Sequence, residues 1–230
     1  MRYIFTPPHQ HYDCGLGYTA CNFYYAAKAL SECESVLGDS NLPTCYLQRH
    51  SIELFLKSLI YILHKKYNIS FGVGFSLEKP GVLLKEKWTG MFLTHDLIGL
   101  YAYFSKLFSE VSNQLPCSVN WELPKRIEER INLIGGTDPK SDYFRYPIST
   151  NRSQDGKKSS NQEVEMEELL EKMNNGPVVT TLLVDSNDDV QNIYIENAEV
   201  LLKVKAALDE VCDFFNGVHA AFRVELMGGL

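Results

Sequence analysis

The sequence predicts a mainly α-helical protein, an antiparallel bundle of about five helices that carries a small β-hairpin insertion. Two observations lead to this fold class. Apolar residues recur at helical spacing over long stretches, and the link between the first two stretches is short, as it is between antiparallel neighbours. The chain has 230 residues, of which 45% are hydrophobic, enough for the core of one large domain. We therefore interpret residues 1–230 as a single domain with excursions at 68–92 and 149–196.

The segment from Cys45 to Lys66 is the centre of the predicted bundle. It is apolar on almost every side, which is typical of a helix that lies inside a bundle. Its polar line consists of Arg49, Glu53 and Lys57, which stack on one helix face because they are spaced at i, i+4 and i+8. Such a line is either the solvated edge of the helix or the wall of a groove.

Four more helices complete the predicted bundle. Each shows apolar residues at helical spacing together with a start or stop signal. The first is Leu16–Leu37, which stops at Gly38 and is followed by a connector at 39–43. The next begins at the N-cap Thr94, has Asp96 in its first turn and ends at Val111. The other two are Pro124–Ile134, which ends at Gly135 and Gly136, and a last helix that starts near Asn197.

The remaining segments interrupt this pattern. Residues 1–13 contain two consecutive prolines and predict an extended arm, and residues 68–92 are rich in glycine and predict an irregular excursion with short strands. Residues 149–162 are polar and of low complexity, so we expect a solvated loop or a disordered linker. A short acidic helix at 164–173 and a hairpin of Val178–Val184 with Gln191–Ile195 follow.

Composition and charge exclude several classes of function. The net charge of −7 excludes a basic footprint over the whole surface, so RNA or DNA would need a local patch or a partner. The six cysteines include no CxxC pair and no zinc spacing, and we expect neither a metal nor another cofactor. We expect no signal peptide and no membrane span, and therefore a cytoplasmic protein in a reducing compartment.

Three constellations are candidates for chemistry. In the first, Arg49 and Lys57 hold a phosphate while Glu53 orients them or takes a proton; the alternative is a salt-bridge ladder. In the second, His95 is an acid/base beside Asp96, or the segment simply starts a helix. In the third, Arg145 points into a site among aromatic residues, or it belongs to a packed loop.

Two of these segments resemble a known family. RHSIELFLKSL in the second helix and THDLIGLY at the start of the third are similar to segments of HEPN-type helical domains. The resemblance implies an α-helical bundle, often dimeric, of the kind common in prokaryotic toxin–antitoxin and defence systems. Catalytic members share an Arg-x(4–6)-His motif that cleaves RNA without metal. In this chain five residues separate Arg145 from Asn151, which stands where the motif requires a histidine.

The leading hypothesis is a HEPN-like protein of a prokaryotic defence, toxin–antitoxin or stress module. We expect a homodimer that binds RNA, a nucleotide or a cognate protein partner without the standard nuclease chemistry. One alternative is a metal-independent ribonuclease with His50 or His95 as acid/base and Arg145 as the transition-state cation. Another is a purely structural interaction module. The predicted binding groove consists of Arg49, Glu53, Lys57, Asp96 and Tyr146.

Overall fold

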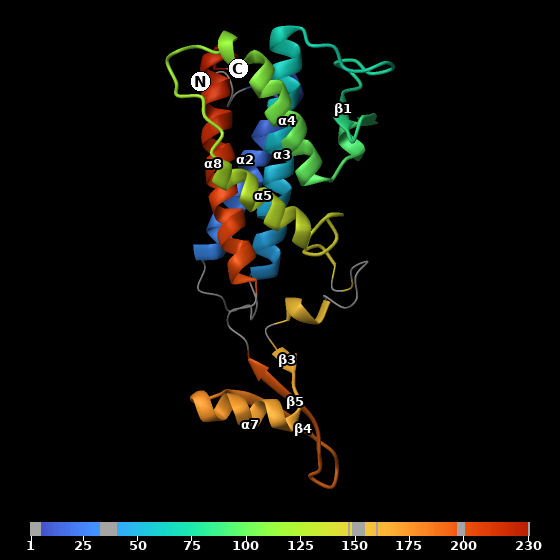
Figure 1. Cartoon of the computed structure of the whole chain (residues 1–230), viewed down its shortest axis with the longest axis vertical. Helices are drawn as coiled ribbons and strands as arrows, with labels where there is room; N and C mark the ends of the chain where they lie inside the picture. The colour runs from blue at the N-terminus through green and yellow to red at the C-terminus, as the bar shows by residue number, and fades with distance from the viewer. Residues whose placement is uncertain are drawn as a thin grey trace. The chain divides into compact units, whose positions relative to one another are not determined.

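The chain folds into mainly helical structure with two small antiparallel sheets (Figure 1). The computed structural model describes residues 6–32, 41–146, 148, 155–159, 161–196 and 201–229. The chain divides into two compact units, each described by itself below. The larger unit comprises Met1–Arg145 and Val204–Leu230, and the smaller unit comprises Tyr146–Lys203.

The larger unit contains the five main helices that the sequence predicts. The predicted connector is shorter than expected, because Asn41 and Pro43 lie in the first turn of the second helix, where proline is tolerated since its missing N–H has no partner there. The predicted stop at Gly38 lies outside the described residues. In chain order the helices are α2 (Leu16–Glu32), α3 (Asn41–Tyr67), α4 (Leu97–Val111), α5 (Lys125–Thr137) and α8 (Leu202–Glu225).

Helix α2 runs antiparallel to α3, as predicted. Cys14, just before α2, donates to the hydroxyl of Tyr61 near the end of α3, whereas Ala20 accepts from Ser51 near its start. Contacts therefore run in opposite order along the two helices. The bundle is not antiparallel throughout, however, because α3, α4 and α8 all run in the same direction.

Two contacts establish the parallel direction of α3 and α4. His95, just before α4, contacts Glu53, and further along both helices Tyr103 bonds to His64 at 2.9 Å. The excursion after α3 must therefore return the chain along the length of α3 before α4 begins. The same ascending order relates α4 to α8 through the aromatic pairs Phe104–Phe215 and Phe108–Phe222.

The excursion is more regular than the sequence suggests. Strands β1 (Gly81–Leu84) and β2 (Lys87–Gly90) form an antiparallel hairpin. Its two turn residues, Lys85 and Glu86, both have positive φ, as tight hairpin turns require. The short 3-10 helix η2 (Met91–Leu93) then leads into α4.

The predicted helix boundaries need two corrections. Thr94 does not cap α4, because its hydroxyl donates to the carbonyl of Gly90; Asp96 is the cap and accepts from the N–H of Gly99 at 3.0 Å. Helix α5 does not end at its glycines but continues through both. A side chain at Gly135 would collide with Ile98, so this glycine lets α4 and α5 pack closely.

The N-terminal arm is also less extended than predicted, since Pro8–Gln10 form the 3-10 helix η1. Asp13 follows it and is buried. Its carboxylate accepts from the N–H of Gly15 at 3.1 Å, from the N–H of Gly17 at 2.7 Å and from the hydroxyl of Ser58 at 2.5 Å. The imidazole of His219 lies 3.6 Å from the same carboxylate. This cluster joins the start of α2 to α3 and α8.

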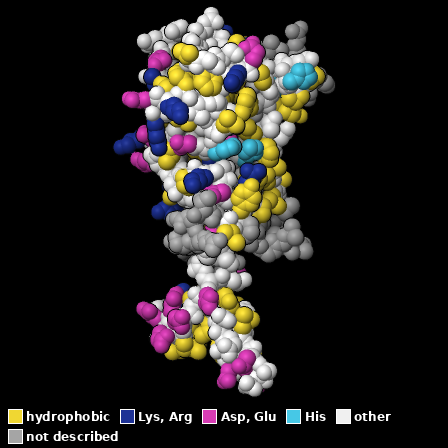
Figure 2. All heavy atoms as spheres, turned by 90° about the vertical axis from the view of Figure 1, so that its right-hand side faces the viewer, with side chains coloured by type: hydrophobic (Ala, Val, Ile, Leu, Met, Phe, Trp, Pro, Cys, Tyr) yellow, Lys and Arg dark blue, Asp and Glu magenta, His cyan; other side chains and the backbone are white. Residues whose placement is uncertain are grey.

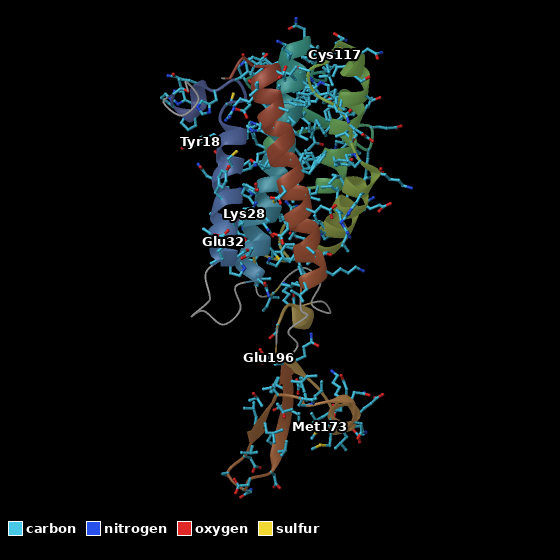
Figure 3. All side chains as sticks on the ribbon, turned by 90° about the vertical axis from the view of Figure 1, so that its left-hand side faces the viewer. Tyr18, Lys28, Glu32, Cys117, Met173 and Glu196 are labelled. Atoms are coloured by element: carbon cyan, nitrogen blue, oxygen red, sulfur yellow. The ribbon has the colours of Figure 1, made fainter. Side chains whose placement is uncertain are left out.

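The described part of the smaller unit contains a three-stranded antiparallel sheet and the α-helix α7, and Figure 3 labels Met173 on that helix and Glu196 at the end of a strand. Its predicted acidic helix and hairpin are both present. Residues 161 and 162, predicted to end a polar linker, instead form a strand with Glu163, because all three pair with β5 on the side away from β4. Its elements are η4 (Gly156–Lys158), β3 (Asn161–Glu163), α7 (Met166–Asn175), β4 (Thr180–Val184) and β5 (Val190–Glu196).

We expect Gly17→Ala to destabilise the larger unit. Alanine normally stabilises a helix relative to glycine, but here its Cβ would overlap the ring of buried His219. The ring must shift, and the expected loss is about 1–3 kcal/mol in the free energy of unfolding, measured by denaturant titration. The matched control is Gly217→Ala in α8, where a Cβ meets open space and should stabilise by about 0.5–1 kcal/mol. Equal effects of the two substitutions would contradict the packing argument.

Asp13 predicts an acid-sensitive contribution to stability. Burial alone raises the pKa of this carboxyl, but His219 and the hydrogen bonds from Ser58 and Gly17 outweigh it and lower the pKa to about 2. Because this lies below the value in an unfolded chain, the contribution is complete above about pH 4 and is lost as the pH falls toward 2. It amounts to about 2 kcal/mol. Asp13→Asn should be less stable at pH 7 yet lose less on acidification, whereas exposed Asp188→Asn should keep the parent's pH slope.

Candidate functional site

Five charged or titratable side chains from three parts of the larger unit form one connected group, which we call the ionic network. Helix α3 supplies three of them at i, i+4 and i+8 on one face. The residue just before the N-cap of α4 supplies the fourth, and the C-cap residue of α5 supplies the fifth. The members of the ionic network are Arg49, Glu53, Lys57, His95 and Asp138.

Glu53 is the centre of the ionic network. Its carboxylate is 1% exposed and contacts three other members. Lys57 Nζ donates to Oε1 at 2.7 Å, and Arg49 Nη1 donates to Oε2 at 2.6 Å. Burial raises the pKa of Glu53, but Lys57 and then Arg49 outweigh burial, so that its pKa lies below the usual value. Glu53 is therefore a carboxylate at neutral pH.

Arg49 has no exposed surface, and this corrects its predicted role. Its Nε lies 3.1 Å from Asp138, its Nη1 bonds to Glu53, and its Nη2 donates to the backbone carbonyl of His95. A guanidinium held on all of these sides cannot reach a phosphate in solvent. Lys57 is also buried. The polar line of α3 is thus neither an exposed salt-bridge ladder nor the wall of an open groove; its three side chains form buried ion pairs inside the larger unit.

His95 is the member of the ionic network that reaches the surface, with 49% of its side chain exposed. Its Nδ1 lies 3.0 Å and 3.3 Å from the two oxygens of Glu53. Since a carboxylate only accepts hydrogen bonds, Nδ1 carries the proton and Nε2 is the nitrogen presented to solvent. A buried carboxylate that orients an imidazole in this way makes it an acid/base or hydrogen-bonding group of defined geometry.

His50 lies within electrostatic range of the ionic network. Its ring stacks parallel to Tyr46 and meets Phe23 edge-on, with ring centroids 4.6 Å apart in the second case. Burial lowers the pKa of His50; Glu53 opposes this shift, while Lys57, Arg49 and His95 reinforce it. His50 is accordingly neutral at pH 7, with its ring packed against Phe23 and Tyr46.

The segment that contains Arg145 is joined to the ionic network through its backbone. Asp138 Oδ1 accepts from the N–H groups of Asp142 and Tyr143 at 2.9 Å and 3.0 Å, while its other oxygen faces Arg49. The rings of Tyr143 and Phe144 are buried, and the side chain of Arg145 is exposed. The predicted aromatic loop is thus a packed loop with an Arg at its outer side.

Two residues of the predicted groove have other positions. Asp96 caps α4 through the N–H of Gly99, so its carboxylate holds a helix end in place. Tyr146 belongs to the smaller unit, where its carbonyl accepts from Lys158 at 3.0 Å. Neither is a member of the ionic network.

Exposed histidines of the larger unit lie on a surface that contains both apolar and charged side chains. In Figure 2, histidine side chains lie between hydrophobic and basic side chains on one face of this unit. Phe92 and Leu93, which precede His95 by three and two residues, are 54% and 82% exposed. Phe92 therefore presents an aromatic ring to solvent three residues before the oriented imidazole.

Two clefts of the larger unit are lined by other residues. One of about 350 Å³ is lined by residues of α8 and of the 119–123 segment, including Trp121 and Phe214. Another of about 340 Å³ lies between the β1–β2 turn and α4. No member of the ionic network lines the first, so the buried charges do not serve it. Among the described residues, no group of three histidine, cysteine or acidic side chains is placed to hold a metal ion.

Sequence reasoning missed Asp138 and the Asp13 cluster. Asp138 follows a helix end and precedes a proline, a position where a cap is common, but nothing local indicates that it pairs with Arg49. His219 on the apolar face of α8 was a usable signal, because a histidine in a buried row needs a polar partner.

No protein-family model, curated protein or solved structure matches this chain. Within the described ranges, none of the helices has the length and apolar character that crossing a membrane requires.

We expect Arg49→Met to destabilise the larger unit by about 3–5 kcal/mol, because it leaves buried Asp138 without its cation. The matched control is Arg126→Met. Arg126 is 66% exposed, and its partner Glu210 keeps Arg130, so we expect a change of about 0–1 kcal/mol. Denaturant unfolding of both variants measures the difference. Similar values for the two would show that the buried ion pairs of Arg49 contribute no more than a surface ion pair.

Proposed function

We propose that this chain is a HEPN-like helical protein of a prokaryotic defence, toxin–antitoxin or stress module, and that it binds RNA at the surface around His95. The observation that supports this most is the half-exposed His95 imidazole, whose Nδ1 is held by the buried carboxylate of Glu53. The family assignment rests on the RHSIELFLKSL and THDLIGLY segments, which contribute Arg49, Glu53, Lys57 and His95 to the ionic network.

RNA suits this surface for chemical reasons. The exposed Nε2 of a neutral His95 accepts a hydrogen bond from a ribose 2′-hydroxyl, and an imidazolium would donate to a phosphate. The exposed ring of Phe92 offers a face on which an unpaired base can stack. Single-stranded RNA is the form that presents unstacked bases to such a surface.

The acidic net charge does not oppose this proposal. The smaller unit, residues 146–203, contains eleven acidic and five basic residues, a net charge of −6, so the larger unit carries −1. The repulsion of RNA therefore originates in the smaller unit, not around His95. In the larger unit a local site is compatible with the near balance of charges.

Binding is tested by fluorescence anisotropy with a labelled single-stranded RNA. We expect His95→Ala to weaken binding about tenfold, since a stacked or charge-assisted contact contributes about 1–3 kcal/mol. His9→Ala is the matched control, because His9 is an exposed histidine on η1, and it should bind like the parent. Absence of RNA binding by the parent, or equal affinities of the two variants, would refute the proposal.

A second candidate function is metal-independent cleavage of RNA, and the electrostatic interaction between His50 and His95 favours it. In this reaction a neutral His50 takes the proton of a 2′-hydroxyl as it attacks the adjacent 3′-phosphate, and His95, in its imidazolium form, gives the Nε2 proton to the departing 5′-oxygen. The same RNA, incubated with excess chelator and run on a denaturing gel, separates the two functions. Cleavage by the parent that both His50→Ala and His95→Ala abolish would make the protein a ribonuclease and not only a binder.

A further inference from the structure

Strand β4 of the smaller unit is an edge strand. The sheet order is β3-β5-β4, so β4 pairs with β5 along one side, and no strand among the described residues pairs with its other side. Exposed edges with free backbone groups pair readily with an added strand. Natural edges of this kind are commonly protected by charges or proline within the strand, but the sequence of β4 is TTLLV.

The backbone groups that face outward can be assigned from the register. The Glu196 N–H donates to the carbonyl of Val179, which makes these two residues a hydrogen-bonded pair. In an antiparallel ladder such pairs alternate with pairs whose N–H and C=O groups point away from each other. With Thr180 opposite Ile195 and Leu182 opposite Ile193, the outward groups belong to Thr180 and Leu182.

The side chains of β4 leave apolar surface uncovered. Leu182 lies opposite Ile193, on the face that carries the small core of this unit. Ile193 is buried, yet Leu182 is 49% exposed, so the cover over this face does not extend across β4. Val184 and Val179 are also exposed, and so are Leu170 and Met173 on α7. An added strand would cover part of this surface.

The charge of this unit selects the partner. Its residues 161–196 carry a net charge of −8, and Figure 2 shows acidic side chains gathered on the small unit. A second copy of the same strand would bring a second set of these charges close, which is unfavourable. A chain with basic residues would be attracted instead, and apolar residues at alternate positions would cover Leu182.

We propose that the free edge of β4 binds an extended protein segment in which basic and apolar residues alternate, and that this segment adds to the sheet as a fourth strand. Backbone hydrogen bonds to Thr180 and Leu182 supply the pairing. The apolar side chains lie over the core face, and the basic ones lie near the acidic groups of the unit. This inference does not depend on the RNA site.

The probe is a labelled eight-residue peptide of alternating lysine and valine, titrated into the full chain. Two peptides serve as comparisons: one with glutamate in place of lysine, and one that keeps the lysines but carries proline in place of two valines. We expect only the first to bind, with affinity that falls as salt rises. In hydrogen exchange, the amides of Thr180 and Leu182 should become protected when it binds. Equal binding of the proline peptide would reduce the interaction to unspecific charge attraction and overturn the proposal.

Substitution of Leu182 tests the edge directly. Leu182→Pro removes an outward N–H without removing a bond to β5, a position where strands tolerate proline. We expect it to weaken binding about tenfold, equivalent to about 1.4 kcal/mol. Leu182→Thr keeps the N–H and should weaken binding less. If the proline variant does not fold, hydrogen exchange of the parent chain tests the proposal instead, through protection of the Thr180 and Leu182 amides by the peptide. A dimer of the parent chain that Leu182→Pro dissociates and the peptide cannot displace would overturn the proposal in favour of a second copy.

Discussion

A carboxylate buried inside the helical bundle is the constraint on which the larger unit depends. Removing a charged Glu53 from water is unfavourable by several kcal/mol, and only close opposite charges offset this. Lys57 and Arg49 supply them from the same face of α3. Buried Arg49 then requires a second anion, and Asp138 at the end of α5 provides it. Each buried charge therefore requires an opposite charge beside it. These ion pairs together fix α3, the start of α4 and the end of α5 relative to one another.

The same constraint accounts for the exposed group of the candidate site. After Lys57 and Arg49 are bonded, Glu53 still accepts from His95 Nδ1. The imidazole is thereby fixed in orientation while half of it remains in solvent. Because the ionic network fixes the His95 side chain before any ligand binds, this side chain loses little conformational entropy on binding. The buried charges thus serve the site by support and not by direct contact, which differs from the phosphate clamp that their spacing suggested.

Helix direction brings this network together. If α4 ran antiparallel to α3, its N-terminus would lie at the far end of α3, remote from Glu53. The excursion through β1 and β2 returns the chain, so that α4 starts beside the middle of α3 and runs with it. The uneven division of charge has a comparable effect. The smaller unit carries a net charge of −6 and the larger unit −1, and the two proposed partners differ in charge for this reason.

The sequence by itself determined the five main helices, the acidic helix and the hairpin, because apolar periodicity and turn residues are local properties of the chain. It also placed Arg49, Glu53 and Lys57 on one face, since i+4 spacing needs no knowledge of the fold. Only the tertiary structure decided that this face is internal, that His95 contacts Glu53 across 42 residues, and that Asp138 neutralises Arg49 across 89. The strand at 161–163 exists for the same reason, because its pairing partner lies beyond α7 and β4. Contacts between residues far apart in sequence depend on helix direction and on which buried charges must be balanced, and local periodicity carries neither kind of information.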